Sequence, residues 1–184
     1  METFVALMRG INVGGTRRLP MAELRALSVK IGLYRPETYI QSGNLIVDAD
    51  MAADEVRALL ERAIDKRFGL RVDVVVRSAL QWHRTVAANP FAGETAAVPK
   101  MLHLYLSCHP LKPSAAKELE PKAQAGERLA VARGALWIDY GVNGVGKSKL
   151  TPLVLDKACG SPATGRNWNS VLKIAEMIEA RGKV

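Results

Sequence analysis

The chain has 184 residues, 48% of them hydrophobic and 24% charged, and this balance excludes disorder over most of its length. Its two cysteines, Cys108 and Cys159, exclude a disulfide-rich scaffold, and the apolar run from Phe4 to Met8 is too short for a signal-peptide core or a membrane span, so we expect a cytoplasmic protein. The 26 Lys and Arg residues outnumber the 18 Asp and Glu residues, and the resulting formal charge of +8 favours anionic partners.

The first 80 residues alternate short strands and helices. A turn-rich, basic loop follows the first apolar run, and Pro20 and Gly32 stand where a helix would begin and end. The Ser42-Gly43 pair between two short apolar runs is typical of a hairpin turn. The predicted elements are strands at 3–9, 38–41, 44–48 and 72–76 and helices at 21–31 and 56–68.

This order, βαββαβ, predicts a particular sheet. Each helix returns the chain so that the strand after it runs parallel to the strand before it. Right-handed crossovers then give a four-stranded antiparallel sheet with both helices on one face, the ferredoxin-like plait.

The second half repeats the start of the same order, without visible sequence identity to the first. We predict a strand at 101–107, a short helix at 113–123, a hairpin of 129–132 and 136–140, a helix ending near Cys159 and a final helix from about Asn167. A fourth strand is not obvious, and residues 161–164 are the candidate. The prediction is an α+β chain of two linked ferredoxin-like subdomains, the second less regular: 1–80, a helix and linker at 81–100, and 101–184.

Residues 141–148 read GVNGVGKS and fit the P-loop pattern G-x-x-x-x-G-K-[ST]. The context opposes a nucleotide-hydrolysing site. The preceding strand alternates as an antiparallel strand does, Pro152 would interrupt the following helix, and only 36 residues follow Ser148. We expect the helix to begin later, with Ser148 or Thr151 as its cap. Two interpretations stay open: an anion site at Lys147, Ser148 and Lys149, or a solvated basic loop.

A second basic segment, TGRNWNS at 164–170, precedes the last helix. Arg166 could bind a phosphate together with the lysines of the 141–149 loop, and the charge of residues 141–184 is 7 basic minus 3 acidic, or +4. The alternative is that Asn167 or Asn169 caps the helix. The candidate anion site comprises Lys147, Ser148, Lys149, Arg166 and Asn167.

Polar side chains also gather at one predicted sheet edge. Arg9 and Asn12 follow the first strand, and Gln41, Ser42 and Asn44 flank the hairpin turn. In a plait these two segments meet, so they could form a small polar site for a substrate. The alternative is that Ser42 and Asn44 only shape the hairpin and Asn12 only caps a loop.

Other chemistry has little support in the residue pattern. His83, His103 and His109 lack zinc-ligand spacing, so we expect no metal and no cofactor. Neither cysteine has an adjacent cue for activation. Aromatic residues make up 5%, and the strand at 44–48 has none, which argues against base stacking on its sheet.

Five short motifs lie in order along the chain: MRGINVGG at 8–15, TYIQSGN at 38–44, NPF at 89–91, GKSKL at 146–150 and RNWN at 166–169. Together they resemble the bacterial family catalogued as domain of unknown function 1697, over nearly the whole chain. The resemblance implies two linked α+β plaits and no assigned activity. In similar proteins arginine often replaces Lys147 and Gly141 is not part of the pattern, so the resemblance implies that the P-loop match is incidental.

Three functional hypotheses follow. The leading one is binding of an anionic, phosphate-bearing ligand, a nucleotide or a nucleic acid, through the basic 141–149 loop. The second is an enzyme acting on a small substrate at the Arg9/Asn12/Gln41/Ser42/Asn44 edge, where no general base is visible. The third is a protein-interaction module without a ligand. Whether the chain is an enzyme, and its oligomeric state, stay open.

Overall fold

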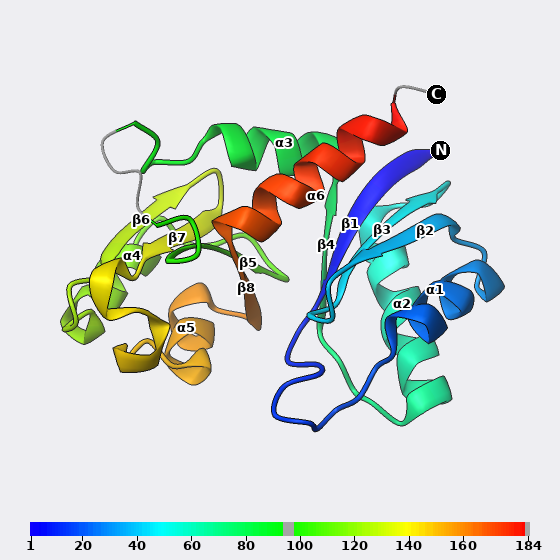
Figure 1. Cartoon of the computed structure of the whole chain (residues 1–184), viewed down its shortest axis with the longest axis horizontal. Coiled ribbons are helices and arrows are strands. Elements are labelled where there is room, and N and C mark those ends of the chain that lie inside the picture. The colour runs from blue at the N-terminus through cyan, green and yellow to red at the C-terminus, as the bar shows by residue number, and fades with distance from the viewer. Residues whose placement is uncertain (94–97, 183–184) are drawn as a thin grey trace. The chain divides into compact units, whose positions relative to one another are not determined.

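The computed structural model describes residues 1–93 and 98–182, so residues 94–97 of the predicted linker lie outside the described residues. The chain divides into two compact units (Figure 1). The first unit comprises Met1–Trp82 and Ile174–Val184, and the second comprises His83–Lys173. The predicted domain limits at 80 and 100 stay a prediction. Within the described ranges, no helix has the length and apolarity needed to cross a bilayer.

The first unit has the predicted βαββαβ order. Its four strands are hydrogen-bonded in the order β2-β3-β1-β4, and every neighbouring pair is antiparallel. Helices α1 and α2 lie on one face of the sheet (Figure 1). The elements are β1 (Glu2–Met8), α1 (Met21–Lys30), β2 (Tyr34–Tyr39), β3 (Asn44–Ala49), α2 (Ala53–Phe68) and β4 (Val74–Ser78). The ferredoxin-like prediction is confirmed.

The central strands of this sheet are buried on both faces. Phe4, Ala6 and Met8 of β1 belong to the core that α1 and α2 cover. Val5 and Leu7 point to the opposite face because side chains alternate along a strand, and each is at most 1% exposed. A strand buried on both sides needs an apolar run rather than alternation, which explains why residues 4–8 carry no charge.

The hairpin between β2 and β3 requires glycine at its turn. Gly43 has φ of +76°, and a Cβ placed there would lie 2.6 Å from Ile11 Cδ1 and 2.7 Å from Met8 Cβ. The turn therefore needs both a left-handed backbone and the absence of a side chain. β2 begins at Tyr34, four residues before the predicted strand. Its pairing with β3 is irregular between Tyr34 and Glu37.

The second unit contains the same kind of sheet. Its strands are antiparallel in the order β6-β7-β5-β8, which matches the order of the first sheet element by element. The fourth strand, β8, spans Ala163–Asn167 where 161–164 was predicted. The other elements from residue 79 on are α3 (Ala79–Ala87), β5 (Leu102–Ser107), α4 (Ala115–Leu119), η1 (Glu120–Lys122), β6 (Arg128–Ala132), β7 (Ala135–Asp139), η2 (Gly141–Asn143), η3 (Val145–Lys147), α5 (Pro152–Cys159) and α6 (Trp168–Arg181).

The helices of the second unit are shorter than those of the first, with five residues in α4 and eight in α5. Both pack on one face of the sheet, where Leu119 and Leu155 meet Leu136 and Ile138. The α+β prediction of two plaits, the second less regular, therefore holds for the sheets and for the reduced helices.

Candidate functional site

The 141–149 loop joins β7 to α5 through the two 3-10 turns η2 and η3. Between the turns, Gly144 has φ of +69° and ψ of 172°, a region that is essentially confined to glycine. Helix α5 begins at Pro152, and the predicted cap Thr151 accepts a hydrogen bond from Val154 N at 3.4 Å. The glycine of this motif thus has a conformational role that does not depend on phosphate.

The sheet around the loop differs from that of a P-loop protein. β7 lies between β6 and β5 and is antiparallel to both strands. The following helix begins at Pro152 rather than near Gly146, so its N-terminus does not directly follow the glycine-rich turn. A P-loop needs a strand leading directly into a helix whose first N–H groups face the phosphate. The geometry supports the interpretation that GVNGVGKS is an incidental match.

Two polar side chains of the loop bind the segment that precedes β6. Ser148 Oγ donates to the carboxylate of Glu127, and Lys149 Nζ donates to Gln124 Oε1 at 2.6 Å. Burial alone would raise the pKa of Glu127, but hydrogen bonds from Ser148 and from backbone N–H groups outweigh it and lower that pKa. Lys147 is exposed, and its ammonium group has no hydrogen-bond or ion-pair partner among the described residues.

Arg166 lies on the face of the second sheet opposite to that of Leu150, which follows the 141–149 loop, and an anion site shared by Arg166 and the loop stays a prediction. Arg166 stands opposite Leu104 in the β5–β8 pairing, and Leu104 stands opposite Trp137, so all three share one face of the sheet. Leu150, at the end of the loop, packs on the other face with Leu136. The sequence places Arg166 just before a helix. It does not show that Arg166 belongs to a strand, or that its side chain lies on the sheet face opposite to α5.

The contacts of Arg166 and Asn167 are structural. The Arg166 side chain is 7% exposed and donates to Thr164 Oγ1 and to Gly165 O, each at 2.8 Å. Burial lowers its pKa to about 10. Asn167 Oδ1 accepts a hydrogen bond from Ser170 N at 3.0 Å and so caps α6, as the alternative interpretation predicted.

The predicted polar edge of the first sheet does come together. Asn12 bridges the loop after β1 and the hairpin: its Nδ2 donates to Leu19 O at 2.9 Å and to Gln41 O at 2.8 Å. Its Oδ1 accepts a hydrogen bond from Leu19 N at 2.8 Å. Asn12 thus fixes the loop, and its φ of +54° puts its backbone in the left-handed region, which Asn adopts more readily than most residues.

The other members of this edge are also engaged. Asn44 Nδ2 donates to Tyr39 O at 3.0 Å and to Ser42 Oγ at 3.1 Å, which closes the hairpin. Arg9 forms a 3.2 Å ion pair with Asp73 at the start of β4. The edge therefore contains side chains that organise backbone, and its use as a substrate site stays a prediction.

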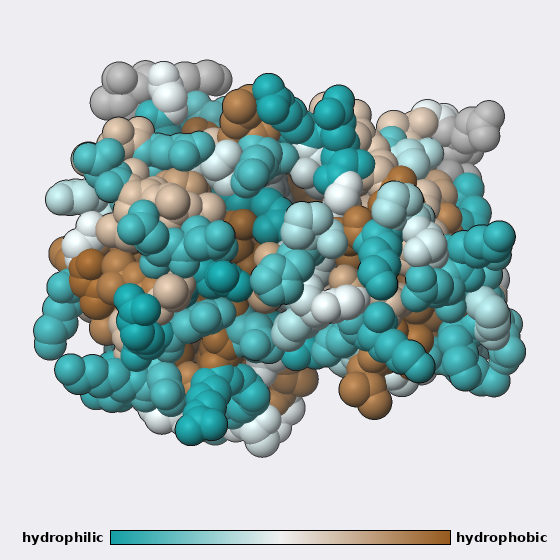
Figure 2. Space-filling view, turned by 180° about the vertical axis from the view of Figure 1, so that it is seen from behind, coloured by the Kyte–Doolittle hydropathy of each residue, from teal (hydrophilic) through white to brown (hydrophobic). Residues whose placement is uncertain are grey.

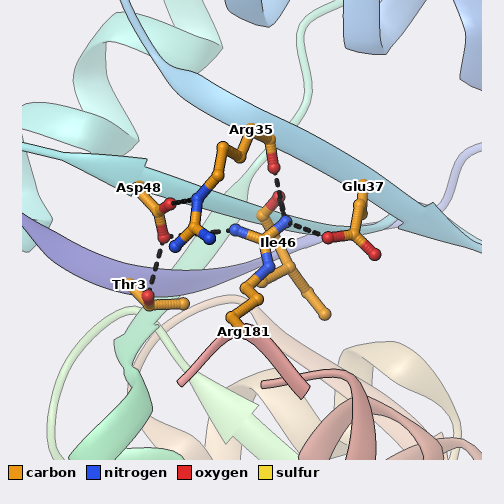
Figure 3. Close-up of polar contacts among 6 residues, drawn as sticks. All are labelled: Thr3, Arg35, Glu37, Ile46, Asp48 and Arg181. Carbon is orange, nitrogen blue, oxygen red and sulfur yellow. Dashed lines mark hydrogen bonds and ion pairs between the residues drawn. The ribbon is translucent and has the colours of Figure 1, made fainter. Parts of the chain in front are cut away.

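A buried charge network lies on the face of the first sheet that α1 and α2 do not cover. It was not predicted from the sequence. Figure 3 shows Arg181 of α6 reaching Asp48 of β3, with Nη1 and Oδ1 3.2 Å apart. Its Nη2 also donates to Glu37 Oε1 at 2.8 Å and to Ile46 O at 3.1 Å. Asp48 in turn accepts hydrogen bonds from Thr3 Oγ1, at 2.7 Å, and from Arg35 Nε.

The two charges at the centre of this network are buried. Asp48 is 3% exposed and Arg181 is 8% exposed, and the two buried charges compensate each other together with their outer partners Arg35 and Glu37. The two residues are 133 positions apart, and no local pattern joins them. The one available signal was a carboxylate inside the apolar strand at 44–48. The arrangement anchors the end of α6 on the first sheet.

Two tyrosines and a histidine form the other unforeseen cluster, in the second unit. The hydroxyl oxygens of Tyr105 and Tyr140 are 2.8 Å apart, and the His103 ring meets Tyr140 edge-on with 5.2 Å between centroids. Burial raises the pKa of Tyr105 and lowers that of His103. Burial also raises the pKa of Cys159 to about 11, which leaves it a poor nucleophile. Among residues 1–93 and 98–182, no three His, Cys, Asp or Glu side chains are placed to hold a metal ion.

Comparison with known proteins agrees with the two-plait architecture. The solved structure of the conserved bacterial protein SP0830 from Streptococcus pneumoniae is similar in fold, with a TM-score of 0.74 and 21% sequence identity. The match covers 97% of this chain and 99% of that one. No curated protein matches the chain. The family model described as protein of unknown function (DUF1697) matches residues 1–137, and the chain therefore belongs to this family.

Proposed function

We propose that the chain binds an extended phosphate-bearing polyanion, such as a nucleic acid, through exposed cations of its second unit. The observation that carries this proposal is the distribution of charge. Residues 83–173 contain 12 Lys and Arg against 6 Asp and Glu, which gives +6 of the total +8. The first unit contains 14 against 12, or +2, so the positive charge is concentrated in one half of the chain.

Most cations of the second unit are exposed, Arg166 being buried, whereas two of its carboxylates are engaged within the chain. Asp139 pairs with Arg128 at 2.6 Å, and Glu127 accepts the Ser148 hydroxyl. Exposed lysines without an ion pair to any described residue include Lys112, Lys117, Lys122, Lys147 and Lys157. Such side chains can contact phosphates without losing existing partners. Their binding would release counterions that are condensed on the polyanion.

The arrangement favours an extended ligand over a single phosphate. Arg166 faces away from the 141–149 loop, and Ser148 and Lys149 already have partners within the chain. Lys147 alone would hold a single phosphate weakly, because an exposed ion pair contributes only about 0–1 kcal/mol. A polyanion can combine several such contacts.

Base-specific contacts are not part of the proposal. Trp137 and Tyr140 are 0% and 1% exposed, so these large rings of the second sheet offer no stacking platform. Binding through phosphates alone should show little sequence preference and should weaken steeply with salt.

The test is fluorescence anisotropy with a labelled single-stranded oligonucleotide over a range of salt concentrations. The double variant Lys147→Glu/Lys149→Glu should weaken binding and reduce the slope of log K against log salt by about 1.4, if both lysines contact phosphates. The matched control is Arg18→Glu/Arg62→Glu, which changes the net charge equally in the first unit. Equal loss of affinity in the two double variants would mean that only total charge matters and would refute a site in the second unit.

The enzyme alternative at the Arg9/Asn12/Gln41/Ser42/Asn44 edge has less support. Its amide side chains donate to backbone carbonyls of Leu19, Gln41 and Tyr39 and hold the loop and the hairpin in place. A substrate would have to replace these hydrogen bonds.

A further inference from the structure

A groove between α1 and α2 of the first unit has an apolar floor. It has a volume of about 510 Å³, and its apolar lining residues, here termed the floor, are Ala26, Leu27, Ile31 and Ala63. The volume lies within the range of ordinary small-molecule sites, roughly 300–1,000 Å³. Two of the four floor residues are alanines, and larger side chains at these positions would narrow the groove.

The rim of this groove is mostly cationic. Lys30, Lys66, Arg67 and Glu23 line it, and Arg67 forms a 3.2 Å ion pair with Glu23. Lys30 and Lys66 are exposed, and neither forms an ion pair with a described residue. Figure 2 shows apolar surface bordered by hydrophilic side chains on the first unit. The groove thus combines uncovered apolar surface with two uncompensated positive charges.

The helix dipole explains only the cations of this groove and not its apolar lining. Lys30 stands in the last turn of α1, and Lys66 and Arg67 stand in the last turn of α2, where the helix dipole favours cations. That effect accounts for the sign of the charges. It does not account for an open apolar floor between the two helices, which a protein would ordinarily cover or fill.

We propose that this groove binds an amphiphilic anion, whose apolar chain lies on the alanine-rich floor and whose carboxylate or phosphate pairs with Lys30 or Lys66. The methylene stems of the lysines would extend the apolar contact while their ammonium groups meet the charged head. A helix of a partner protein fits less well, because helix-in-groove recognition uses a series of large anchors along several turns, and this floor is short. The groove belongs to the first unit, so the proposal is independent of polyanion binding by the second.

The test uses the full chain labelled with ¹⁵N and titrated with laurate below its critical micelle concentration. Amide signals of Ala26, Leu27 and Ala63 should shift and saturate. Dodecyltrimethylammonium, which has a tail of nearly the same length and the opposite charge, should bind at least about threefold more weakly, as expected for ion pairs at a solvent-exposed rim. Equal binding of the two amphiphiles, or shifts that avoid α1 and α2, would overturn the proposal.

Two sets of variants separate charge from shape. Lys30→Gln/Lys66→Gln should weaken laurate binding by about threefold to tenfold, whereas Lys112→Gln/Lys117→Gln, with the same change of charge in the second unit, should leave it unchanged. Ala63→Leu should narrow the groove and weaken binding of both amphiphiles. Ala26→Leu, on the α1 side of the groove lining, provides the same test should Ala63→Leu disturb folding. Unaltered laurate binding in a folded floor variant would refute the site.

Discussion

Removal of the Arg181 side chain should destabilise the first unit strongly. The guanidinium is almost fully buried, and it lies 3.2 Å from Asp48 Oδ1 and 2.8 Å from Glu37 Oε1. In Arg181→Ala, Asp48 would keep its hydrogen bonds from Thr3 and Arg35 but would lose a buried positive charge. Breaking a buried pair on one side costs about 3–5 kcal/mol. Because Arg35 and Thr3 remain, we expect about 3 kcal/mol, the lower end of that range.

The assay is urea denaturation followed by circular dichroism and by tryptophan fluorescence, since two units need not unfold together. Trp82 is the one tryptophan of the first unit, so variants that keep only this tryptophan would report on that unit. Arg62→Ala, at an exposed position of α2, is the matched control and should change the free energy of unfolding by less than about 0.5 kcal/mol. A loss below about 1 kcal/mol in Arg181→Ala, or a loss equal to that of the control, would refute the reasoning.

The same network predicts a dependence on pH. Burial alone would raise the pKa of Asp48, but hydrogen bonds from Thr3 and Arg35 and the charge of Arg181 outweigh it and lower the pKa. The folded-state pKa is therefore below the unfolded value of about 3.9. The stabilisation is present above that value and is lost as the pH falls through the lower folded-state pKa. Asp48→Asn should flatten this acid limb of the stability profile, and an unchanged acid limb would contradict the assignment.

Three further predictions concern single positions. Gly43→Ala should lower the free energy of unfolding by about 2–4 kcal/mol in denaturant titrations, because the added Cβ meets a left-handed backbone and close neighbours; a change within about 0.5 kcal/mol would contradict this. Gly165→Ala should displace the Tyr105 ring, because a Cβ at this position would lie 2.5 Å from Tyr105 Cε1, and should alter the near-ultraviolet circular dichroism; a spectrum identical to that of the wild type would be the opposing result. No Mg²⁺-dependent ATP hydrolysis is expected in a phosphate-release assay, and hydrolysis that Lys147→Ala abolished and Lys157→Ala preserved would show a true P-loop.

Local patterns were sufficient to predict the element order. The turn at Ser42-Gly43 and the cap at Thr151 before Pro152 depend on residues adjacent in sequence, and both are present. The antiparallel four-stranded sheets follow from that order together with the handedness of crossovers. The fourth strand of the second unit has little apolar character. The order of the other elements nevertheless predicted its position to within a few residues.

Contacts between distant residues could not be predicted in the same way. The face that Arg166 presents depends on its register in β8, and a shift of one residue in a strand reverses the face. The pairing of Asp48 with Arg181 depends on where the end of α6 meets the first sheet. Asn12 reaches Gln41 across the polar edge, but the sequence did not show that Asn12 and Asn44 donate to backbone carbonyls.

Polyanion binding by the second unit is tested most directly by mapping where an oligonucleotide contacts the chain. A ¹⁵N-labelled sample would be titrated with a short single-stranded oligonucleotide at low salt and again at high salt. We predict amide shifts in the 141–149 loop and around Lys112, Lys117 and Lys122, which disappear as salt rises. Absence of shifts at low salt, or shifts confined to the first-unit edge at residues 9–12 and 41–44, would contradict the proposed function.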